Sequence, residues 1–378
     1  MMPPKTHKKG PTASASPAPQ PTSAVSRRAL IGSGLSAIVA TTVGLPTPSL
    51  AQHSAWGLRA PSGTNARSIH SGHSLTDSYI HTGPWPGTIR LLAESLGIDD
   101  VDTKFVKSTI PGSPLAWRWR NSAGDLRPTD PTADARWHIR DFDTLVITEG
   151  GPPPRVARPS DAPGMNDALD YLCRFAANAL ENGNGGEGAQ DIILWSIWPS
   201  LAMWRPDPPN WTESWQEFDN FRAALPEYGR SFQFIAQYAT WKLRPFYPNL
   251  PDIWQVWVFP GHLWMARLWD DLSAGTVPDL ARMQDLFRDD IHTNDIGGYG
   301  LACLMLTALY QRDLRTQSQL YRLPEVSSNL QDYFTQIAWE ITTTYAPAGM
   351  GGQEARDAIW DPDEMEDPLP NWTPAAAR

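Results

Sequence analysis

Two short stretches, far apart in the chain, carry residue types that together could cleave an ester. Ser74 stands in the heptapeptide SGHSLTD, directly after the run RSIH, and Asp289 and His292 stand three positions apart in DDIH. A serine hydroxyl becomes an effective nucleophile when a histidine takes its proton and a carboxylate orients the imidazole ring. We therefore expect Ser74 to be the nucleophile, His292 the general base and Asp289 the group that orients it.

These stretches meet only if the fold brings them together, and the sequence predicts a parallel β-sheet that could do so. Runs rich in apolar and β-branched residues recur along the chain, and stretches with helical spacing separate them. The expected strands are 67–70, 103–108, 143–148, 191–198 and 252–259. Such strands are typical of a parallel sheet covered on both faces. Ligands bind beyond the carboxyl ends of such strands, which is where Ser74 stands.

The stretches between the strands predict helices. One spans 84–97, with three apolar residues on one face and Gly97 as its C-cap. A second spans 165–180, and a third covers 213–243, where a proline is expected to kink or split it. An apolar helix follows His292 from Asp295 onward. A closing helix is expected within 320–346.

The reactive motifs resemble those of the SGNH/GDSL hydrolase superfamily. Gly72-His73-Ser74-Leu75 follows the first strand, and Asp289-x-x-His292 precedes an apolar helix, as in that family. The similarity covers about 66–310 in order and spacing. It implies a three-layer α/β/α fold with a flavodoxin-like parallel sheet of about five strands. It also implies cofactor-free ester hydrolysis, with the backbone amides of Ser74 and Gly112 as the oxyanion hole.

Two positions depart from the family pattern. His73 occupies the place of the GDSL aspartate, a position that varies in the superfamily. Glu149, in VITEGG, occupies the place of the asparagine in the third motif. An asparagine donates a hydrogen bond to the oxyanion, whereas an ionised glutamate would repel that charge. Glu149 is therefore expected either to be protonated in the site or to point elsewhere, as a capping carboxylate.

Other residues around these motifs offer different chemistry. Trp117, Arg118 and Trp119 follow the Gly112 loop and could line a cleft for a carbohydrate or an acidic ligand, or the tryptophans could pack under the loop. His262 and Trp264 follow the fifth strand and could form the opposite wall. A cluster of potential metal ligands suggests a less favoured metal site: His70, His73, Asp77 and His81.

The chain begins with a segment that reads as an export signal. Ser26-Arg27-Arg28-x-Leu30 precedes a short apolar run, and Ser49-x-Ala51 offers a cleavage site, which is the pattern of a twin-arginine signal peptide. Loss of its five basic residues would change the formal charge from −10 to −15. We expect a periplasmic or secreted protein that uses the twin-arginine machinery, does not bind nucleic acid, and has no stable membrane insertion after cleavage.

Three segments are therefore expected. Residues 1–51 form the signal peptide and its disordered extension, 52–346 the hydrolase domain, and 347–378 an acidic, disordered tail. The two cysteines, Cys173 and Cys303, are expected either as a disulfide or as buried free thiols.

The sequence thus favours an exported serine esterase that cleaves an O-acyl group, for which acetyl on a carbohydrate is a candidate. A second hypothesis keeps the scaffold without turnover, as a periplasmic carbohydrate-binding protein. An O-acyltransferase is a third, since transfer to a sugar and transfer to water use the same residues.

Overall fold

The computed structural model describes residues 56–80, 83, 87–121, 134–150, 160, 164–189, 191–202 and 219–374. The expected signal peptide and His81 lie outside these residues. No helix of the described part is long and apolar enough to cross a membrane.

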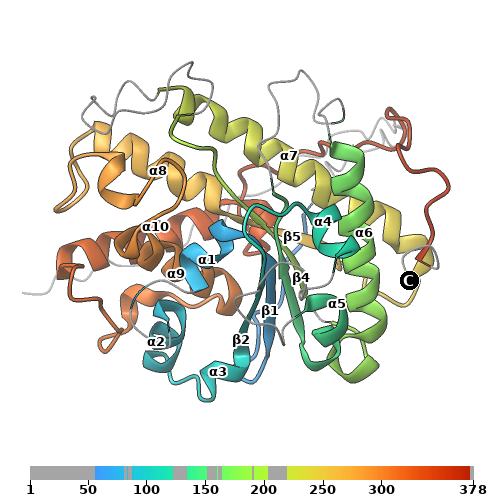
Figure 1. The fold of residues 1–378 in the computed structure, drawn as a ribbon, viewed down its shortest axis with the longest axis horizontal. Coiled ribbons are helices and arrows are strands. Elements are labelled where there is room, and N and C mark those ends of the chain that lie inside the picture. Colours follow the sequence, from blue (N-terminus) through green and yellow to red (C-terminus); the bar gives the residue numbers. More distant parts are fainter. Residues whose placement is uncertain are drawn as a thin grey trace, which may run out of the picture. The chain divides into compact units, whose positions relative to one another are not determined.

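A five-stranded, all-parallel sheet forms the centre of the fold (Figure 1). Its strands are β1 (Ser68–Gly72), β2 (Phe105–Thr109), β3 (Thr144–Ile147), β4 (Asp191–Ser196) and β5 (Val256–Pro260). Their spatial order is β2-β1-β3-β4-β5, which is the order of flavodoxin-like doubly wound sheets. The predicted α/β class and all five predicted strands are confirmed.

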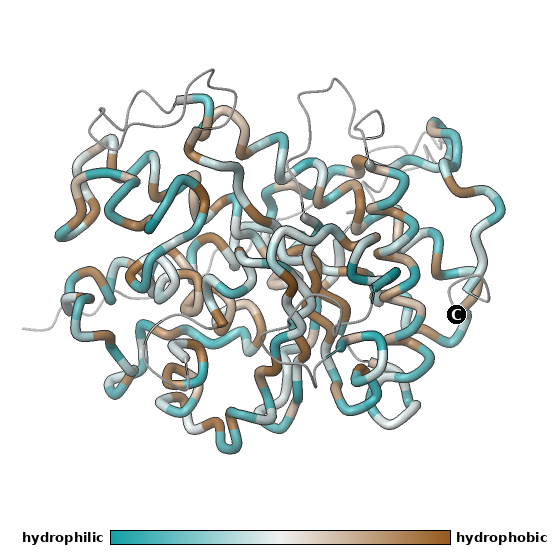
Figure 2. Tube along the Cα trace, in the orientation of Figure 1, coloured by the Kyte–Doolittle hydropathy of each residue, from teal (hydrophilic) through white to brown (hydrophobic). Residues whose placement is uncertain are grey.

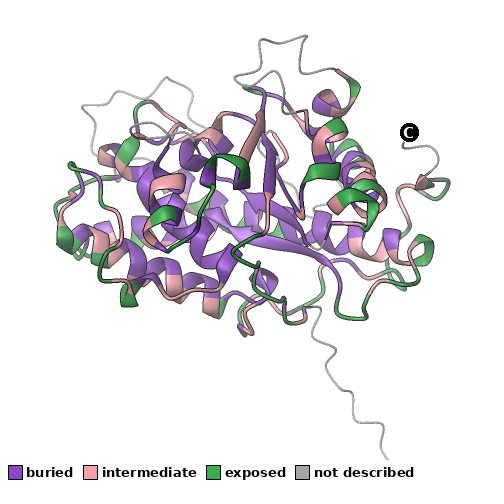
Figure 3. Cartoon of the chain, turned by 90° about the horizontal axis from the view of Figure 1, so that it is seen from below, coloured by how far each residue is buried: buried purple, intermediate pink, exposed green. Residues whose placement is uncertain are grey.

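The strands are buried on both faces, as their continuous apolar runs require. Every residue of β1, β3, β4 and β5 is buried, and the sheet lies within the apolar interior of the fold (Figures 2 and 3). Helices must therefore cover both faces, because a parallel sheet leaves no side open to water.

Two sets of helices provide this cover (Figure 1). The first set is α1 (Ser74–Ile80), α2 (Thr88–Ser95), α8 (Gly261–Ser273), α9 (Asp295–Tyr310) and α10 (Ser328–Thr344). The second set is α4 (Leu115–Arg120), α5 (Ala135–His138), α6 (Met165–Asn182) and α7 (Asp219–Leu243). The short α3 (Val101–Lys104) leads directly into β2. This division is the three-layer α/β/α arrangement.

The predicted helices are present, with one local difference. Gly97 adopts a positive φ of 74° just after α2, as the expected helix stop requires. Pro226 lies inside α7 and does not split it over the described residues. Helix α9 begins at Asp295, where the Asn294 side chain accepts a hydrogen bond from the Gly297 amide. It is buried almost all round, because it lies between α1, α2, α8 and α10.

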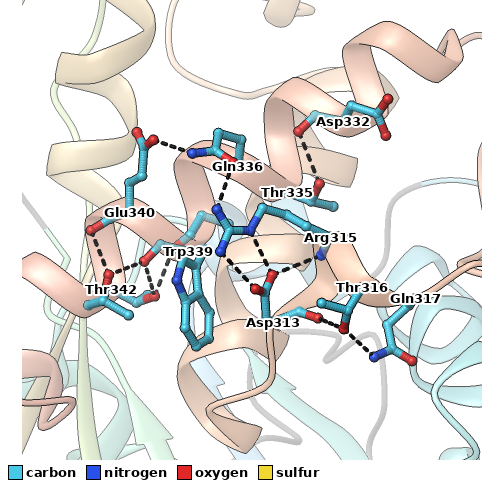
Figure 4. A network of polar contacts seen from close by, with 12 residues as sticks. Asp313, Arg315, Thr316, Gln317, Asp332, Thr335, Gln336, Trp339, Glu340 and Thr342 are labelled. Atoms are coloured by element: carbon cyan, nitrogen blue, oxygen red, sulfur yellow. Dashed lines mark hydrogen bonds and ion pairs between the residues drawn. The ribbon is translucent and has the colours of Figure 1, made fainter. Parts of the chain in front are cut away.

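A polar network joins the loop after α9 to α10 (Figure 4). The Arg315 guanidinium pairs with Asp313 at 2.7 Å, donates a hydrogen bond to Gln336 at 2.8 Å and stacks over the Trp339 ring at 5.5 Å. These groups lie at the surface, so the network contributes modestly to stability. It nevertheless fixes the position of the loop after α9 against α10.

The C-terminal segment corrects one expectation. Residues 347–374 were expected to be disordered, but they pack against α7. The Asp367 carboxylate contacts Lys242 Nζ at 2.6 Å and accepts a hydrogen bond from the Tyr238 hydroxyl at 2.8 Å. Trp360 is buried, and its amide donates to Gln237. The segment reads as acidic, but its spaced tryptophans supply the apolar surface that anchors it.

The two cysteines are buried free thiols, so the alternative of a disulfide is excluded. Cys173 lies in α6 and Cys303 in α9, which belong to the two different helical sets.

Replacing Trp360 with alanine should destabilise the protein by about 3–5 kcal/mol, the usual cost of removing a buried tryptophan. Its ring lies 4.9 Å from Tyr238, 5.2 Å from Trp241 and 5.7 Å from Phe234. Urea unfolding would measure the change. Trp137→Ala is the matched control, because Trp137 is 72% exposed and should cost less than about 0.5 kcal/mol. Equal effects of the two substitutions would contradict the packing of the C-terminal segment.

Candidate active site

The side chains of Ser74, His292 and Asp289 form a continuous hydrogen-bonded chain. His292 Nε2 lies 2.7 Å from Ser74 Oγ, and His292 Nδ1 lies 2.7 Å and 2.9 Å from the two carboxylate oxygens of Asp289. The carboxylate can only accept, so Nδ1 carries the proton and Nε2 is free to accept from the serine. The structure therefore brings together the three residues that the sequence singled out, in the order that nucleophilic activation needs.

The parallel sheet explains why Ser74 lies where it does. The last residues of β1 pair in register with the last residues of β2 and β3: Gly72 with Thr109, and Ser71 with Ile147. Loops that leave these strands therefore begin at one rim of the sheet. Ser74 is the first residue of α1 at this rim.

The loop that carries His292 is held by its own backbone. The Asp289 carboxylate accepts hydrogen bonds from the amides of Ile291 and His292, at 3.0 Å and 2.7 Å, as well as from the imidazole. Burial raises the Asp289 pKa, but these hydrogen bonds outweigh it and lower the pKa below its usual value. Asp289 therefore stays ionised. Because it is only three residues from His292, one tight loop places its carboxylate against both the backbone amides and the imidazole.

A second loop, 197–202 after β4, braces the histidine loop from outside. Trp198 Nε1 donates to the Ile291 carbonyl at 2.9 Å, and the Leu201 amide donates to the Asp290 carbonyl at 2.6 Å. Asp290 itself accepts from Ser200 Oγ at 2.6 Å. Asp290 is thus a structural neighbour, and Asp289 is the acid that contacts the imidazole.

Ser74 and His292 open into a cavity of about 1060 Å³. Its walls are largely apolar and include Leu75, Pro111, Ile197, Trp198, Tyr228 and Ile291. Its polar lining includes Asp77, Ser200 and Arg288. A mostly apolar cavity with a few polar groups is the usual form of a small-molecule site.

Gly112 lines this cavity, as the resemblance implied for an oxyanion glycine. It has a φ of 68°, a conformation that favours glycine, although a methyl group there would meet no other atom within 4 Å. The neighbouring loop approaches closely: a Cβ on Gly150 would lie 2.5 Å from the Ser113 carbonyl oxygen. The loops after β2 and β3 therefore contact each other through backbone.

Arg118 holds these two loops together instead of lining the cavity. Its buried guanidinium donates to the Ser113 carbonyl at 2.5 Å and to the Thr148 carbonyl. Burial lowers its pKa to about 10, so it remains charged at neutral pH. The expectation that Arg118 lines a ligand cleft is wrong, because both its terminal nitrogens are engaged with backbone.

Glu149 points to the start of α4. Its Oε1 accepts from the Gly150 amide at 2.6 Å and from the Leu115 amide at 3.3 Å. Burial raises its pKa to about 7, although the Arg118 charge and these two amides favour the ionised form. Of the two alternatives that the sequence left open, the capping carboxylate is the one observed. Glu149 does not take over the donor role that the asparagine has in the SGNH/GDSL pattern.

His73 is fixed by the same segment. Its Nδ1 lies 3.3 Å from the Leu75 amide, which donates to it, and its Nε2 lies 3.2 Å from the Glu149 carbonyl oxygen. The ring therefore caps the start of α1 in place of an aspartate. Burial lowers its pKa to about 4, so the ring is neutral at physiological pH.

The alternative metal site finds no support in the described residues. His70 Nε2 contacts Ser68 Oγ and its Nδ1 contacts the Tyr79 hydroxyl, both at 2.9 Å, inside the core. Asp77 accepts from Thr109 Oγ1 at 2.8 Å. No group of three potential ligands gathers among these residues.

The tryptophans expected at the site lie elsewhere. Trp119 packs edge-on against Phe175 at 4.9 Å and lines a separate cavity of about 390 Å³ beside α5 and α6. Trp117 is not among the described residues that line the Ser74 cavity. His262 and Trp264 are buried, with His262 Nδ1 against Ser196 Oγ at 2.7 Å, so the predicted second wall is wrong.

Three residues that line the Ser74 cavity were not predicted from the sequence: Trp198, Tyr228 and Arg288. Trp198 could have been predicted from the sequence, because it follows the strand β4 and therefore lies at the same rim of the sheet as Ser74. Arg288 had a weaker sequence signal, which is its position beside Asp289. Tyr228 lies within α7, where helical periodicity marks it only as buried.

Glu149→Gln should change how stability depends on pH. Because the folded protein holds the Glu149 pKa near 7, above the 4.5 of an ordinary glutamate, this group costs stability as pH rises from about 4.5 to above 7. Partial exposure limits the cost to on the order of 1–3 kcal/mol. Glutamine still accepts from both amides but cannot ionise. Urea unfolding at pH 5 and pH 8 should show the variant gaining more stability relative to the wild type at pH 8 than at pH 5. A constant difference between the two pH values would contradict this account.

Comparison with known proteins adds little about chemistry. No family model matches the chain, and no curated protein matches it. A solved structure of a DUF4886 family protein from Bacteroides uniformis superposes with a TM-score of 0.45 and 13% sequence identity, covering 77% of this chain and 98% of that one. The functional assignment therefore depends on the geometry of the site.

Proposed function

We propose that this protein is a serine esterase of SGNH type that cleaves an O-acyl ester. The observation that carries the proposal is the 2.7 Å contact between His292 Nε2 and Ser74 Oγ, with Asp289 on the opposite ring nitrogen. That arrangement lets the imidazole accept the serine proton while the carboxylate stabilises the resulting charge.

The reaction proceeds in two halves. Ser74 Oγ bonds to the acyl carbon as its proton moves to His292 Nε2. The ester C–O bond then breaks, and the leaving alcohol takes that proton from His292. A water molecule next attacks the acyl-serine and gives a proton to His292. When the acyl–serine bond breaks, Ser74 recovers this proton and the carboxylic acid leaves.

The oxyanion is held by backbone amides in this proposal. The Ser74 amide is at the first position of α1, where no helical carbonyl is available to it, and Gly112 lines the cavity from the facing loop. Because Glu149 is engaged at α4, the third donor of the family is missing. Loss of one such donor typically slows catalysis by about 10²–10³, so we expect slow turnover.

Acyl transfer to a sugar hydroxyl is the neighbouring reaction, because the acyl-serine reacts with whichever hydroxyl reaches it. The carbohydrate-binding protein without turnover is the alternative: Trp119 and Arg118 contact other groups, but Trp198 lines the Ser74 cavity and Glu149 departs from the family pattern. Export by the twin-arginine route to the periplasm or exterior remains part of the proposal, on the sequence of residues 26–51.

Ser74→Ala and His292→Ala should each lower kcat for 4-nitrophenyl acetate by about 10³-fold or more, because each removes a member of a unit that acts together. Ser74→Ala should also abolish covalent labelling by a fluorophosphonate probe. His138→Ala is the control, since His138 is partly exposed at the end of α5 and is not among the residues that line the Ser74 cavity. Undiminished hydrolysis in both active-site variants would refute the esterase proposal.

Gly112→Ala should lower kcat by about 10–10², because alanine disfavours a φ of 68° and relaxation would turn the amide away from the cavity. Gly97→Ala is a matched control: Gly97 has a φ of 74° and equally open space around it, but caps α2. Both variants should lose similar stability in thermal unfolding. If both also lost the same activity, Gly112 would have no oxyanion role.

A further inference from the structure

Arg288 is the one arginine or lysine among the described residues that line the Ser74 cavity. Its side chain is exposed, and it takes part in none of the ion pairs found within the described part of the chain. Arginine is suited to anionic ligands, because its planar guanidinium can donate two parallel hydrogen bonds to a carboxylate or phosphate.

Within the described part of the chain, the acids that adjoin Arg288 or share its cavity already have partners. Asp289 binds the His292 imidazole at 2.7 Å, Asp290 accepts from Ser200 Oγ at 2.6 Å, and Asp77 faces Lys107 Nζ at 3.7 Å. The Arg288 charge is thus left for a ligand. This is notable in a chain with a formal charge of −10, whose overall field disfavours anions.

The backbone fixes Arg288 on the histidine side of the cavity. Its amide donates to the His292 carbonyl at 2.9 Å, and Phe287 and Thr293 form an antiparallel bridge that closes the same loop. In the proposed reaction His292 returns its proton to the leaving alcohol, so the alcohol part of the ester must lie on this side. The Gly112 loop lies on the oxyanion side.

We infer that the substrate is an ester whose alcohol part carries an anionic group, a carboxylate or phosphate, and that Arg288 binds this group. The inference rests on the proposed function and names the substrate class of the same site. The apolar walls of the cavity hold the uncharged part of the ester. Arg288 acts as a specificity residue and does not take part in proton transfer.

The test compares two ester pairs that differ in where the charge lies. The first pair is 4-acetoxybenzoate and its methyl ester, charged or neutral on the alcohol part. The second pair is 4-nitrophenyl hydrogen succinate and 4-nitrophenyl butyrate, charged or neutral on the acyl part. Arg288→Gln should lower the charged-to-neutral ratio of kcat/KM about three- to tenfold for the first pair, mainly through KM. It should leave the ratio for the second pair within about twofold.

Two further variants separate the site from general electrostatics. Arg288→Lys should keep part of the preference, because the charge remains while the two-pronged geometry is lost. Arg140→Gln removes an exposed arginine in the short helical turn Ile139–Asp141 before β3, at the end of the strands opposite to Ser74, and should change neither ratio. An unchanged ratio in Arg288→Gln, or an equal fall for both ester pairs, would overturn the inference.

A binding measurement keeps the inference testable without turnover. If the wild type hydrolyses none of the neutral esters, the esterase proposal fails, and calorimetric titration with 4-hydroxybenzoate and 4-hydroxyphenyl phosphate then decides. Weaker binding of either anion by Arg288→Gln, with Arg140→Gln unchanged, would support an anion site at Arg288. Tighter binding of one of them identifies carboxylate or phosphate as the preferred group. Equal binding by the wild type and Arg288→Gln would overturn it.

Discussion

The hydrogen bond between His292 and Ser74 is the interaction on which the proposed chemistry of this protein depends. It joins residues 218 positions apart, and it has no value unless both loops are held in place. The serine is fixed as the first residue of α1 on the rim of the sheet. The histidine is fixed by Asp289, whose carboxylate binds two backbone amides and the imidazole at once. The same carboxylate therefore shapes the loop and orients the base.

Several polar side chains near the site bind and position backbone groups. Arg118 clamps the loops after β2 and β3, Glu149 caps α4, and His73 caps α1. Each of these side chains is buried or nearly so, and each satisfies backbone groups that would otherwise be costly to bury. All three were predicted from the sequence as residues that could line the site, but of these only His73 lines the Ser74 cavity. Charged and aromatic residues close to a motif are therefore weaker evidence for ligand contact than the motif itself.

The departure at Glu149 has a structural cause. An asparagine at this position could donate into the cavity. A glutamate is longer, and in its ionised form it can accept hydrogen bonds but cannot donate them. Its Oε1 accepts from the amides of Gly150 and Leu115, so the carboxylate joins the loop after β3 to the start of α4. The site is left with backbone donors. The proposed reaction would therefore be slow.

The sequence by itself determined the α/β class, the five strands and the three residues of the hydrogen-bonded chain, because these follow from local periodicity and from short motifs with fixed spacing. Apolar runs mark buried strands, and a three-residue spacing from Asp289 to His292 closes one loop. Only the tertiary structure decided where the long side chains point. Trp119, Arg118 and Glu149 are held by contacts with other segments, whereas Trp198 and Arg288 line the Ser74 cavity from the loops after β4 and before α9. Such contacts depend on segments far apart in the sequence, which is also why residues 347–374 pack on α7, although their composition alone suggested disorder.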